Sequence, residues 1–362
     1  MKNIIDIIPV INCSGKMTYL GSSTLSDEVL DAMKAGAKSY YDMTDLHSKA
    51  YEYIAKRAGA QGAYITPGAS SGIIAATAAL ITRGNRTLIE SVPNVDVKKK
   101  TFVLQKGHSI HFGAKLSQMI ELGGGVVKEV GTANKCLPHH LSDVIDETVC
   151  GIYYVKSHHA VQDGMVSLED TIKIAKENNV PVIVDAAAEE DLQKYLKAGA
   201  DLVIYSGAKA FSGPTSGCIV GNNPYIEWCT LQSIGVMRAM KVGKETILGL
   251  ISAIENQDQS TKTVEQQEEI LLPLFNYFSQ RQGCETSLVK DNVGRSIVRL
   301  RVKINSEFPL NAQGLSKWLK EQKPAIYTRD HHAENGYIEF DPRPMKRADS
   351  EIIISKLEQL LK

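Results

Sequence analysis

The chain has 362 residues, 43% hydrophobic and 23% charged, and its 41 basic residues balance its 41 acidic ones. This neutrality argues against nucleic-acid or membrane-surface binding, and no apolar run approaches the roughly 20 residues that span a bilayer. Six scattered cysteines without a CxxC pair favour a reducing compartment over disulfides or zinc. We therefore expect a cytoplasmic protein with no nucleic-acid or membrane partner. We interpret the run Lys98, Lys99 and Lys100 as a solvated face.

The first part of the chain alternates helices with short apolar strands. Ser26 is a capping candidate for a helix over 25–34, and Gly59 ends a second helix over 46–57. A strand at 63–65 leads through a Gly/Ser turn into an apolar helix over 71–82. Further strands are expected at 87–89, 101–104 and 126–130, and a helix at 112–122.

The middle of the chain continues the alternation with longer apolar strands. Strands are predicted at 151–155, 181–185 and 201–205, with a helix over 167–178 that Ser167 caps. Continuous apolar strands alternating with helices are typical of a mostly parallel sheet covered on both faces. The fold class is therefore α/β.

The last third changes character. A long helical stretch over 244–282 precedes a strand at 296–302, a helix at 315–321, short strands near Ala325 and Tyr337 and a final helix at 349–361. This pattern predicts a small α+β domain. We expect an N-terminal arm at 1–45, a large domain at 46–250 and the small domain at 251–362.

A turn rich in glycine and serine joins the strand at 63–65 to the helix after it, with the sequence TPGASSG at 66–72. The N-terminus of a helix offers backbone N–H groups and a dipole that favour phosphate. The Gly-Lys-Ser/Thr ending of a Walker loop is missing. Alone, the segment predicts phosphate binding and a plain helix cap about equally.

Two charged residues follow buried strands, at the edge of the sheet where α/β proteins bind ligands. Asp185 ends the strand VIVD, and its carboxylate suits a metal, a protonated pyridine nitrogen or a helix cap. Lys209 lies between the strand ending at Tyr205 and a Gly-Pro turn. A desolvated lysine has a lowered pKa and forms Schiff bases readily. Ser206 stands three residues earlier and could donate to a phosphate.

The combination of this turn, Asp185 and Lys209 resembles the fold-type I pyridoxal-phosphate (PLP) enzymes, the aspartate-aminotransferase-like superfamily. The resemblance implies PLP as cofactor, bound by Lys209 as a Schiff base. It further implies that Asp185 pairs with the pyridine nitrogen and that Ala69, Ser70 and Ser71 bind the phosphate.

The resemblance narrows to the selenocysteine synthase group, the L-seryl-tRNA(Sec) selenium transferases. The segments that carry it lie at 9–15, 21–25, 131–135, 201–221 and 237–244. We expect no counterpart of the extra N-terminal domain that those transferases use on tRNA, and the neutrality of the chain argues against an RNA partner. A smaller branch, the D-glucosaminate-6-phosphate ammonia-lyases, is more similar at 40–43, 65–72 and 184–190.

Histidines provide further candidates. His108 follows the strand at 101–104, where many fold-type I enzymes stack a ring on the cofactor; the alternative is an ordinary loop histidine. His158 follows the strand at 151–155 and could contact the cofactor or the substrate, and we include it among the catalytic residues. The doublets at 139–140 and 331–332 have no carboxylate or cysteine at ligand spacing, so no metal is expected.

Five residues are candidates for substrate binding. Arg329 and Arg343 lie in the small domain, where an arginine commonly clamps the substrate carboxylate in this superfamily; either could instead be a surface ion pair. Arg238 and Lys244 belong to a basic stretch that could meet a phosphate or be a solvated helix start. Tyr41 lies in one segment of the ammonia-lyase resemblance.

The predicted reaction is an α,β-elimination on a 2-amino-3-hydroxy sugar acid, such as D-glucosaminate 6-phosphate, to 2-keto-3-deoxygluconate 6-phosphate and ammonia. Lys209 would move the Cα proton, and Lys209 or a histidine would help the 3-hydroxyl leave as water. The alternatives are a transferase acting on seryl-tRNA and a non-catalytic relative that only binds. The resemblance implies at least a homodimer.

Overall fold

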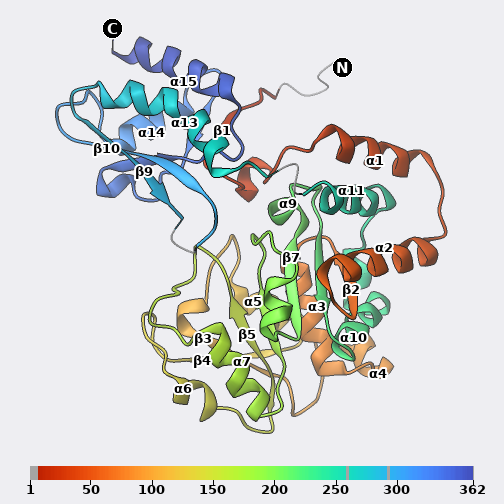
Figure 1. Ribbon diagram of the computed structural model, residues 1–362. Helices are drawn as coiled ribbons and strands as arrows, with labels where there is room; N and C mark the ends of the chain where they lie inside the picture. The colour runs from red at the N-terminus through yellow and green to blue at the C-terminus, as the bar shows by residue number, and fades with distance from the viewer. Residues whose placement is uncertain (1–6, 258–260, 292–293, 362) are drawn as a thin grey trace. The chain divides into compact units, whose positions relative to one another are not determined.

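The computed structural model describes residues 7–257, 261–291 and 294–361 (Figure 1). The chain forms two compact units. One comprises Leu25–Asp258, and the other combines Met1–Thr24 with Gln259–Lys362. We call them the large unit and the C-terminal unit.

The large unit is built on a sheet of seven strands in the order β2-β8-β7-β6-β5-β3-β4. Only β8 runs antiparallel to its neighbours, and the other pairs are parallel. This arrangement confirms the predicted mostly parallel α/β architecture. The strands are β2 (Gly62–Thr66), β3 (Thr101–Gln105), β4 (Val126–Val130), β5 (Val149–Val155), β6 (Val182–Asp185), β7 (Leu202–Ser206) and β8 (Gly217–Gly221).

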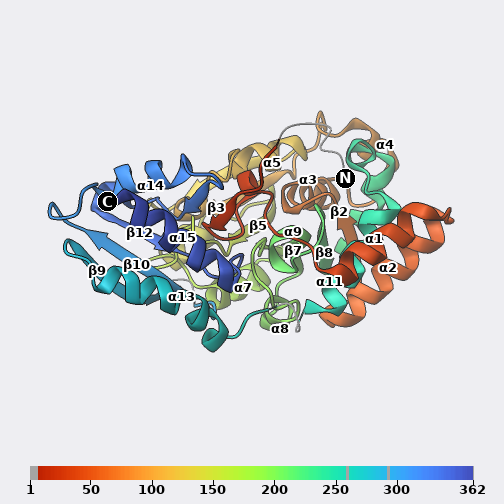
Figure 2. The ribbon, with the colours of Figure 1, turned by 90° about the horizontal axis from the view of Figure 1, so that it is seen from above.

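Helices cover both faces of this sheet, and each face has its own apolar core (Figure 1). One face carries α3 (Ala69–Thr82), α4 (Arg86–Ser91), α5 (Leu116–Leu122) and α10 (Tyr225–Leu231). The other carries α2 (Met43–Ala58), α6 (Pro138–Ser142), α7 (Leu168–Glu177), α8 (Lys194–Ala198) and α11 (Lys244–Glu255). The helix α11 lies between α1 (Asp27–Lys38) and α2, as Figures 1 and 2 show.

The predicted helix boundaries rest on local signals that the structure confirms. The Ser26 hydroxyl accepts from the Val29 N–H at the start of α1, and Ser167 accepts from the Asp170 N–H at the start of α7. Gly59 ends α2 with a φ of 63°, in the left-handed region that favours glycine.

The strand expected at 87–89 is wrong, because these residues lie in helix α4. A short apolar run does not distinguish a strand from a buried helical turn. Here the side chain of Asn85 accepts from the Leu88 N–H and caps a helix. Asparagine before the run was the signal that favoured a helix.

The C-terminal unit has a small α+β fold with a separate core. Its antiparallel sheet has the order β12-β10-β9, and a second pair, β1 with β11, is parallel. The core includes Phe278, Leu300, Leu315 and Phe340. The strands are β1 (Ile11–Cys13), β9 (Cys284–Lys290), β10 (Val298–Ile304), β11 (Ile326–Thr328) and β12 (Tyr337–Phe340); the helices are α13 (Val264–Ser279), α14 (Ala312–Lys320) and α15 (Arg347–Leu360).

The division of the chain differs from the expected boundaries. The arm expected at 1–45 is shared between the units, because β1 pairs with β11 while α1 packs on α11. The long helix expected over 244–282 is not continuous: its described residues include α11 and α13, which belong to different units. Both differences arise from contacts between residues far apart in the sequence, which helical periodicity does not report.

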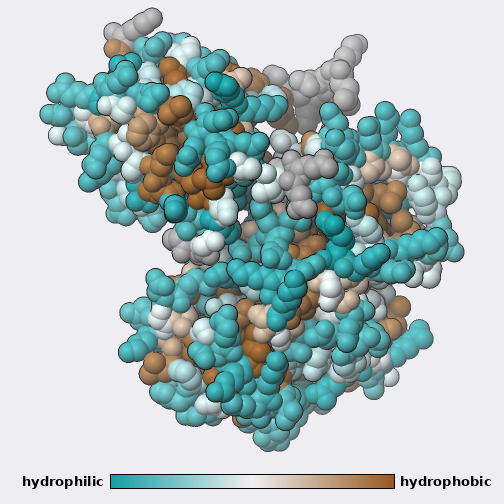
Figure 3. Space-filling view, in the orientation of Figure 1, coloured by the Kyte–Doolittle hydropathy of each residue, from teal (hydrophilic) through white to brown (hydrophobic). Residues whose placement is uncertain are grey.

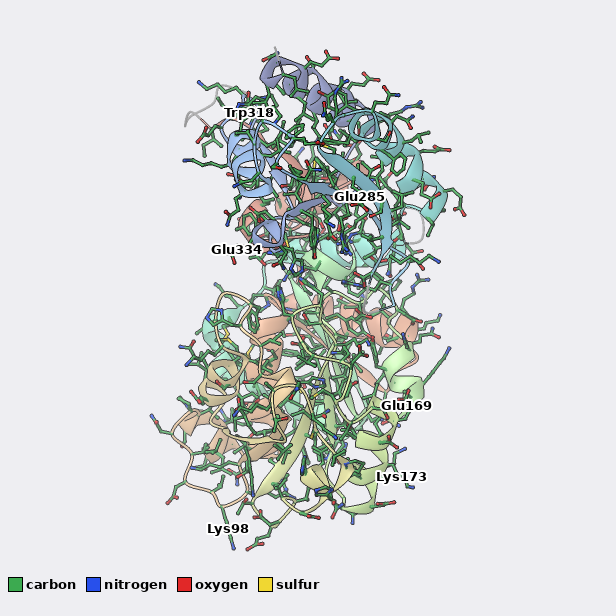
Figure 4. All side chains as sticks on the ribbon, turned by 90° about the vertical axis from the view of Figure 1, so that its left-hand side faces the viewer. Lys98, Glu169, Lys173, Glu285, Trp318 and Glu334 are labelled. Atoms are coloured by element: carbon green, nitrogen blue, oxygen red, sulfur yellow. The ribbon has the colours of Figure 1, made fainter. Side chains whose placement is uncertain are left out.

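The outer surface of the large unit carries charges that local periodicity placed in solvent. Lys98 is exposed and forms an ion pair of 2.6 Å with Glu147, as expected for a solvated face. Lys99 and Lys100 are half-buried, and Lys100 donates to the Val95 carbonyl oxygen at 3.0 Å, so the solvated face expected at 98–100 is limited to Lys98. Figure 4 shows Lys98, Glu169 and Lys173 at the periphery of the unit. Within the described ranges no helix combines the length and apolarity needed to cross a membrane.

Gly217 gives a test of how the edge of this sheet is packed. A Cβ at Gly217 would lie 2.7 Å from the Gly68 carbonyl carbon and 2.7 Å from the Tyr205 oxygen. We expect Gly217→Ala to destabilise the cofactor-free protein by about 1–3 kcal/mol through overpacking. A drop in the midpoint of thermal unfolding measures the effect.

Gly68→Ala is the matched control in the same region. Its Cβ would meet nothing within 4 Å, and its φ of 175° is extended backbone that any residue adopts. We expect its midpoint to stay within a degree or two of wild type. Equal midpoints for wild type and Gly217→Ala would contradict the close approach.

Candidate active site

Strand β8 brings two turns of the large unit together. Its first residue, Gly217, pairs with Thr66 of β2 on one side and with Ser206 of β7 on the other. The turn that starts α3 follows Thr66, and the turn that carries Lys209 follows Ser206. Because Gly217 has no side chain, the backbone of Gly68 approaches β7 and β8 closely.

The turn before α3 is held by its own hydroxyl groups. Both Thr66 Oγ1 and Ser71 Oγ donate to the Gly68 carbonyl oxygen, each at 2.8 Å. Helix α3 begins at Ala69 and runs for 14 residues. Its first N–H groups therefore point out of a fixed helix N-terminus, which is a favourable place for a phosphate. Ala69 and Ser70 remain half-buried at this end.

Asp185 ends β6 and is 5% exposed. Its Oδ1 accepts from the Ala187 N–H at 3.3 Å. Burial raises the pKa of this carboxyl to about 6, against the smaller opposing effects of the Ala187 N–H and the charge of Lys209. Among the described residues no cation lies within ion-pair distance of Asp185. A buried carboxylate without an ion-pair partner is suited to bind a cationic atom of a ligand.

Lys209 lies in the single helical turn α9 (Gly207–Ala210), directly after β7. The Ser206 hydroxyl accepts from the Lys209 N–H at 3.3 Å and so caps this turn. Burial lowers the pKa of the Lys209 amine, and the charge of Asp185 partly opposes the shift. The strands β6 and β7 are neighbours in register, with Asp185 opposite Ile204. Asp185, Lys209 and the α3 turn therefore share one edge of the sheet.

The two candidate histidines differ in their surroundings. His108 is fully buried, its ring stands edge-on to Tyr154, and its Nδ1 accepts from the Val155 N–H at 3.3 Å. Burial, aided by the charge of Lys156, lowers the pKa of His108 to about 4. Its ring presents no accessible face, whereas a stacking residue needs one. His158 is half-buried in the segment after β5, with its ring centroid 3.9 Å from that of His159.

The substrate-binding candidates of the large unit are scattered. Lys244 donates to the Gly36 and Ala37 carbonyl oxygens at 2.7 and 3.0 Å, so it stabilises the end of α1. Arg238 is exposed in a 3₁₀ segment at 236–240. Tyr41 is 40% exposed in the turn between α1 and α2.

Arg329 and Arg343 lie in a network of charges inside the C-terminal unit. Asp341 is fully buried and binds Arg343 through both carboxylate oxygens, at 2.9 and 2.8 Å. The same carboxylate accepts from Arg299 at 2.9 Å. Glu339 accepts from Arg301 and lies 3.5 Å from Arg329 Nε. The sequence reasoning did not find Arg299, Glu339 or Asp341; the alternation Arg-Leu-Arg at 299–301 was the available signal.

The geometry of the large unit fits PLP. Asp185 offers a buried negative charge for the pyridine nitrogen, Lys209 offers a desolvated amine, and the α3 turn offers N–H groups for the phosphate. No group of three histidine, cysteine, aspartate or glutamate side chains in the described ranges is arranged to hold a metal ion.

A mostly parallel sheet with these groups at one edge defines the class of fold-type I PLP enzymes. The aspartate aminotransferase of Thermotoga maritima shares this fold, with a TM-score of 0.57 at 13% identity over 97% of this chain and 92% of that one. The chain belongs to the L-seryl-tRNA selenium transferase (SelA) family, whose model matches residues 10–276. Members of this class use PLP as cofactor.

Curated relatives with names of different reactions span nearly the whole chain. The chain is 40% identical to the D-glucosaminate-6-phosphate ammonia lyase of Salmonella typhimurium, over 97% of this chain and 95% of the relative. It is 35% identical to a 5'-C-glycyluridine monooxygenase-decarboxylase of a Streptomyces species, over 98% and 90%. It is 25% identical to an L-seryl-tRNA(Sec) selenium transferase of Clostridium perfringens, over 97% and 82%.

A solved structure of a D-glucosaminate-6-phosphate ammonia-lyase has a TM-score of 0.90 to this chain at 40% identity. The match covers 98% of this chain and 95% of that one. Both the sequence and the structure comparisons confirm the resemblance to the ammonia-lyase branch, and the selenium transferases are more distant.

The pKa of Asp185 predicts a pH effect on the cofactor-free protein. An unfolded carboxyl loses its proton near pH 3.8, whereas folded Asp185 keeps it to about pH 6. In this window the folded state binds more protons, so its stability falls as the pH rises. We expect wild type to lose roughly 3 kcal/mol more than Asp185→Asn between pH 4 and 7.

Chemical unfolding of both proteins at a series of pH values measures this difference. The control is Asp31→Asn, which removes an exposed carboxylate from α1 and is expected to follow wild type. Parallel stability profiles for wild type and Asp185→Asn would show that Asp185 does not carry the buried proton.

Proposed function

We propose that this chain is a PLP-dependent ammonia lyase that converts a 2-amino-3-hydroxy sugar acid, D-glucosaminate 6-phosphate, to 2-keto-3-deoxygluconate 6-phosphate and ammonia. The observation that carries the proposal is the joint placement of Asp185, Lys209 and the α3 turn at one sheet edge. The 40% identity to an ammonia lyase over nearly the full length supports the substrate.

Asp185 and Lys209 take the central roles. PLP, when bound, supplies an electron-withdrawing pyridinium ring that acidifies the Cα–H bond of an amino acid. Asp185 keeps the pyridine nitrogen protonated, because its buried charge is stabilised by a nearby cation. Lys209 binds the cofactor, and its amine accepts the Cα proton of the substrate. The lowered pKa of Lys209 supplies the neutral amine that this transfer needs.

The remaining residues of the edge hold groups in place. Ala69, Ser70 and Ser71 direct the α3 N-terminus at the cofactor phosphate, and Ser206 adds a hydroxyl beside it. His158, or Lys209 in its protonated form, donates the proton with which the 3-hydroxyl leaves as water. One water molecule then hydrolyses the released enamine, after its tautomerisation, to the 2-keto acid and ammonia. His108 supports the site through its contacts with Tyr154 and Val155.

The anionic ends of the substrate need cationic partners. Arg329 and Arg343 of the C-terminal unit and Arg238 of the large unit are the proposed partners, whereas Lys244 is already bound to the α1 carbonyl oxygens. Tyr41 is proposed to reach substrate from the α1–α2 turn.

We also propose that the protein is at least a dimer. Apolar side chains are exposed in α1 and in the turn that joins it to α2, including Leu30 of α1 at 48% and Tyr40 of the turn at 102% exposure. Hydrophobic surface gathers beside these helices in Figure 3. Exposed apolar surface of this kind is typical of a protein interface.

Lys209→Ala tests the cofactor assignment. We expect the variant to lose the absorbance of the bound cofactor and all measurable ammonia release, because no other residue replaces the amine. Lys173→Ala, which removes an exposed lysine from α7 (Figure 4), should keep both. Undiminished turnover in Lys209→Ala would overturn the proposed role.

A substrate panel tests the reaction. We expect ammonia and 2-keto acid to appear in equal amounts from D-glucosaminate 6-phosphate, without oxygen uptake. Oxygen-dependent decarboxylation of 5'-C-glycyluridine, the activity in the name of the Streptomyces relative, would replace the proposal. Salt-dependent binding of seryl-tRNA in a gel shift would favour a transferase instead.

A further inference from the structure

The Arg329 guanidinium of the C-terminal unit has an ion pair with Glu339 but forms no hydrogen bond within the described residues. The Arg329 side chain is only 13% exposed, yet its Nε is buried without a hydrogen bond, and Glu339 Oε2 is 3.5 Å away. No hydrogen bond joins this guanidinium to any residue that the structure describes. A guanidinium carries five N–H donors, and leaving them unpaired inside a protein is costly. Such an arrangement persists where a ligand completes it.

The other arginines of the network are already paired. Asp341 binds Arg343 and Arg299, and Asp291 binds Arg299 and Arg295. Glu339 Oε1 accepts hydrogen bonds from Nε and from one terminal nitrogen of Arg301. Arg329 is therefore the member of the network with capacity to bind a further anion.

The charge balance of this network indicates what kind of anion fits. Its five arginines are Arg295, Arg299, Arg301, Arg329 and Arg343, and its three carboxylates are Asp291, Glu339 and Asp341. Five positive charges against three negative ones leave a surplus of two. A carboxylate carries one negative charge, whereas a phosphate monoester carries about two at neutral pH and three acceptor oxygens.

The neighbours of Arg329 add to the positive potential. Burial, followed by the charge of Arg299, lowers the pKa of Arg329. Burial, followed by the charge of Arg329, lowers the pKa of the nearby His331. The charges of Asp341 and Glu339 oppose the shift at Arg329 only in part, so a dianion would be stabilised there.

We propose that Arg329 binds the phosphate group of the substrate, while Asp341 keeps Arg343 and Arg299 fixed beside it. Glu339 is the internal partner that the phosphate replaces at Arg329, and it remains bound to Arg301. This assignment rests on the proposed function for the identity of the substrate, but the anion site itself does not depend on turnover.

Inorganic phosphate is the direct probe, titrated calorimetrically into the PLP-loaded protein so that the cofactor occupies the α3 turn. We expect Arg329→Gln to weaken phosphate binding at least tenfold. Arg329→Lys, which keeps the charge without the planar fork, should bind at an intermediate level. Lys303→Gln is the matched control, because it removes one exposed positive charge from β10 of the same unit. It should stay within twofold of wild type.

Steady-state kinetics then separates phosphate from carboxylate recognition. In Arg329→Gln we expect KM for D-glucosaminate 6-phosphate to rise at least tenfold, with kcat and the KM for unphosphorylated D-glucosaminate little changed. An equal rise in KM for both substrates would assign Arg329 to the carboxylate and overturn the proposal. Wild-type phosphate binding in both Arg329 variants, or its loss only in Arg238→Gln, would overturn it as well.

The two proposals fail separately in these experiments. A wild-type protein that releases no ammonia from either sugar acid refutes the proposed function, and the phosphate titration still decides the role of Arg329. A protein with full lyase activity and Arg329-independent phosphate binding refutes only the anion site.

Discussion

The close packing of α3 against the sheet is the constraint on which the candidate site depends. Twelve of the residues of this helix are buried, and it has no polar face of its own to expose. Gly72 lets the helix approach β7, because a Cβ there would lie 2.7 Å from Ile204 Cγ2. Gly217 does the same for the turn before the helix. The helix N-terminus is thereby brought to the edge where β6 and β7 end, so that its free N–H groups and the side chains of Asp185 and Lys209 can serve one ligand.

The same packing makes that edge unfavourable when no ligand is bound. Burial disfavours the ionised form of Asp185 and the protonated form of Lys209, and neither group has an ion-pair partner within the described part of the large unit. Buried charge without a partner reduces stability. A cofactor with a cationic ring nitrogen and an aldehyde that reacts with an amine removes both costs. The C-terminal unit presents a parallel case, since Arg329 is buried among both arginines and carboxylates and its Nε has no hydrogen bond to any described residue. In each unit, the proposed ligand lies at a buried group whose charge has no hydrogen-bonded counter-ion in the described part of the chain.

Much of this arrangement was predictable from local patterns, and the failures have physical reasons. Caps at Ser26, Gly59 and Ser167 act on their own helices, so short-range sequence reports them. The apolar strands that end at Asp185 and Tyr205 are recognisable because parallel strands are buried on both faces. The antiparallel β8 was not predicted, since GCIVG is short and begins and ends with glycine.

The partners of buried charged side chains could not be predicted from the sequence either. Asp341 is bound by Arg299, which lies 42 positions away, and Lys244 reaches carbonyl oxygens of α1 more than 200 positions away. Sequence spacing identifies a basic residue. It does not show whether that side chain already donates its hydrogen bonds to a carboxylate or a carbonyl oxygen of the protein. This distinction separates Arg343 and Lys244, whose side chains donate hydrogen bonds, from Arg329, which has an ion pair of 3.5 Å with Glu339 and no hydrogen bond within the described ranges.

The difference between basic residues with and without hydrogen bonds also bears on substrate specificity within the family. The relatives that span this chain carry names of different reactions at 40%, 35% and 25% identity. Groups that hold the cofactor explain what these proteins share, and they cannot by themselves choose among a sugar acid, a nucleoside and an aminoacyl-tRNA. Selection among these substrates must come from charged side chains that contact the part of the substrate remote from the cofactor. The Arg329 guanidinium has no hydrogen bond among the described residues, and the four other arginines of its network outnumber the three carboxylates by one. The site proposed there therefore favours a small dianion over a neutral nucleoside. The phosphate site proposed at Arg329 would therefore add selectivity for a phosphorylated substrate to the cofactor chemistry that the family shares.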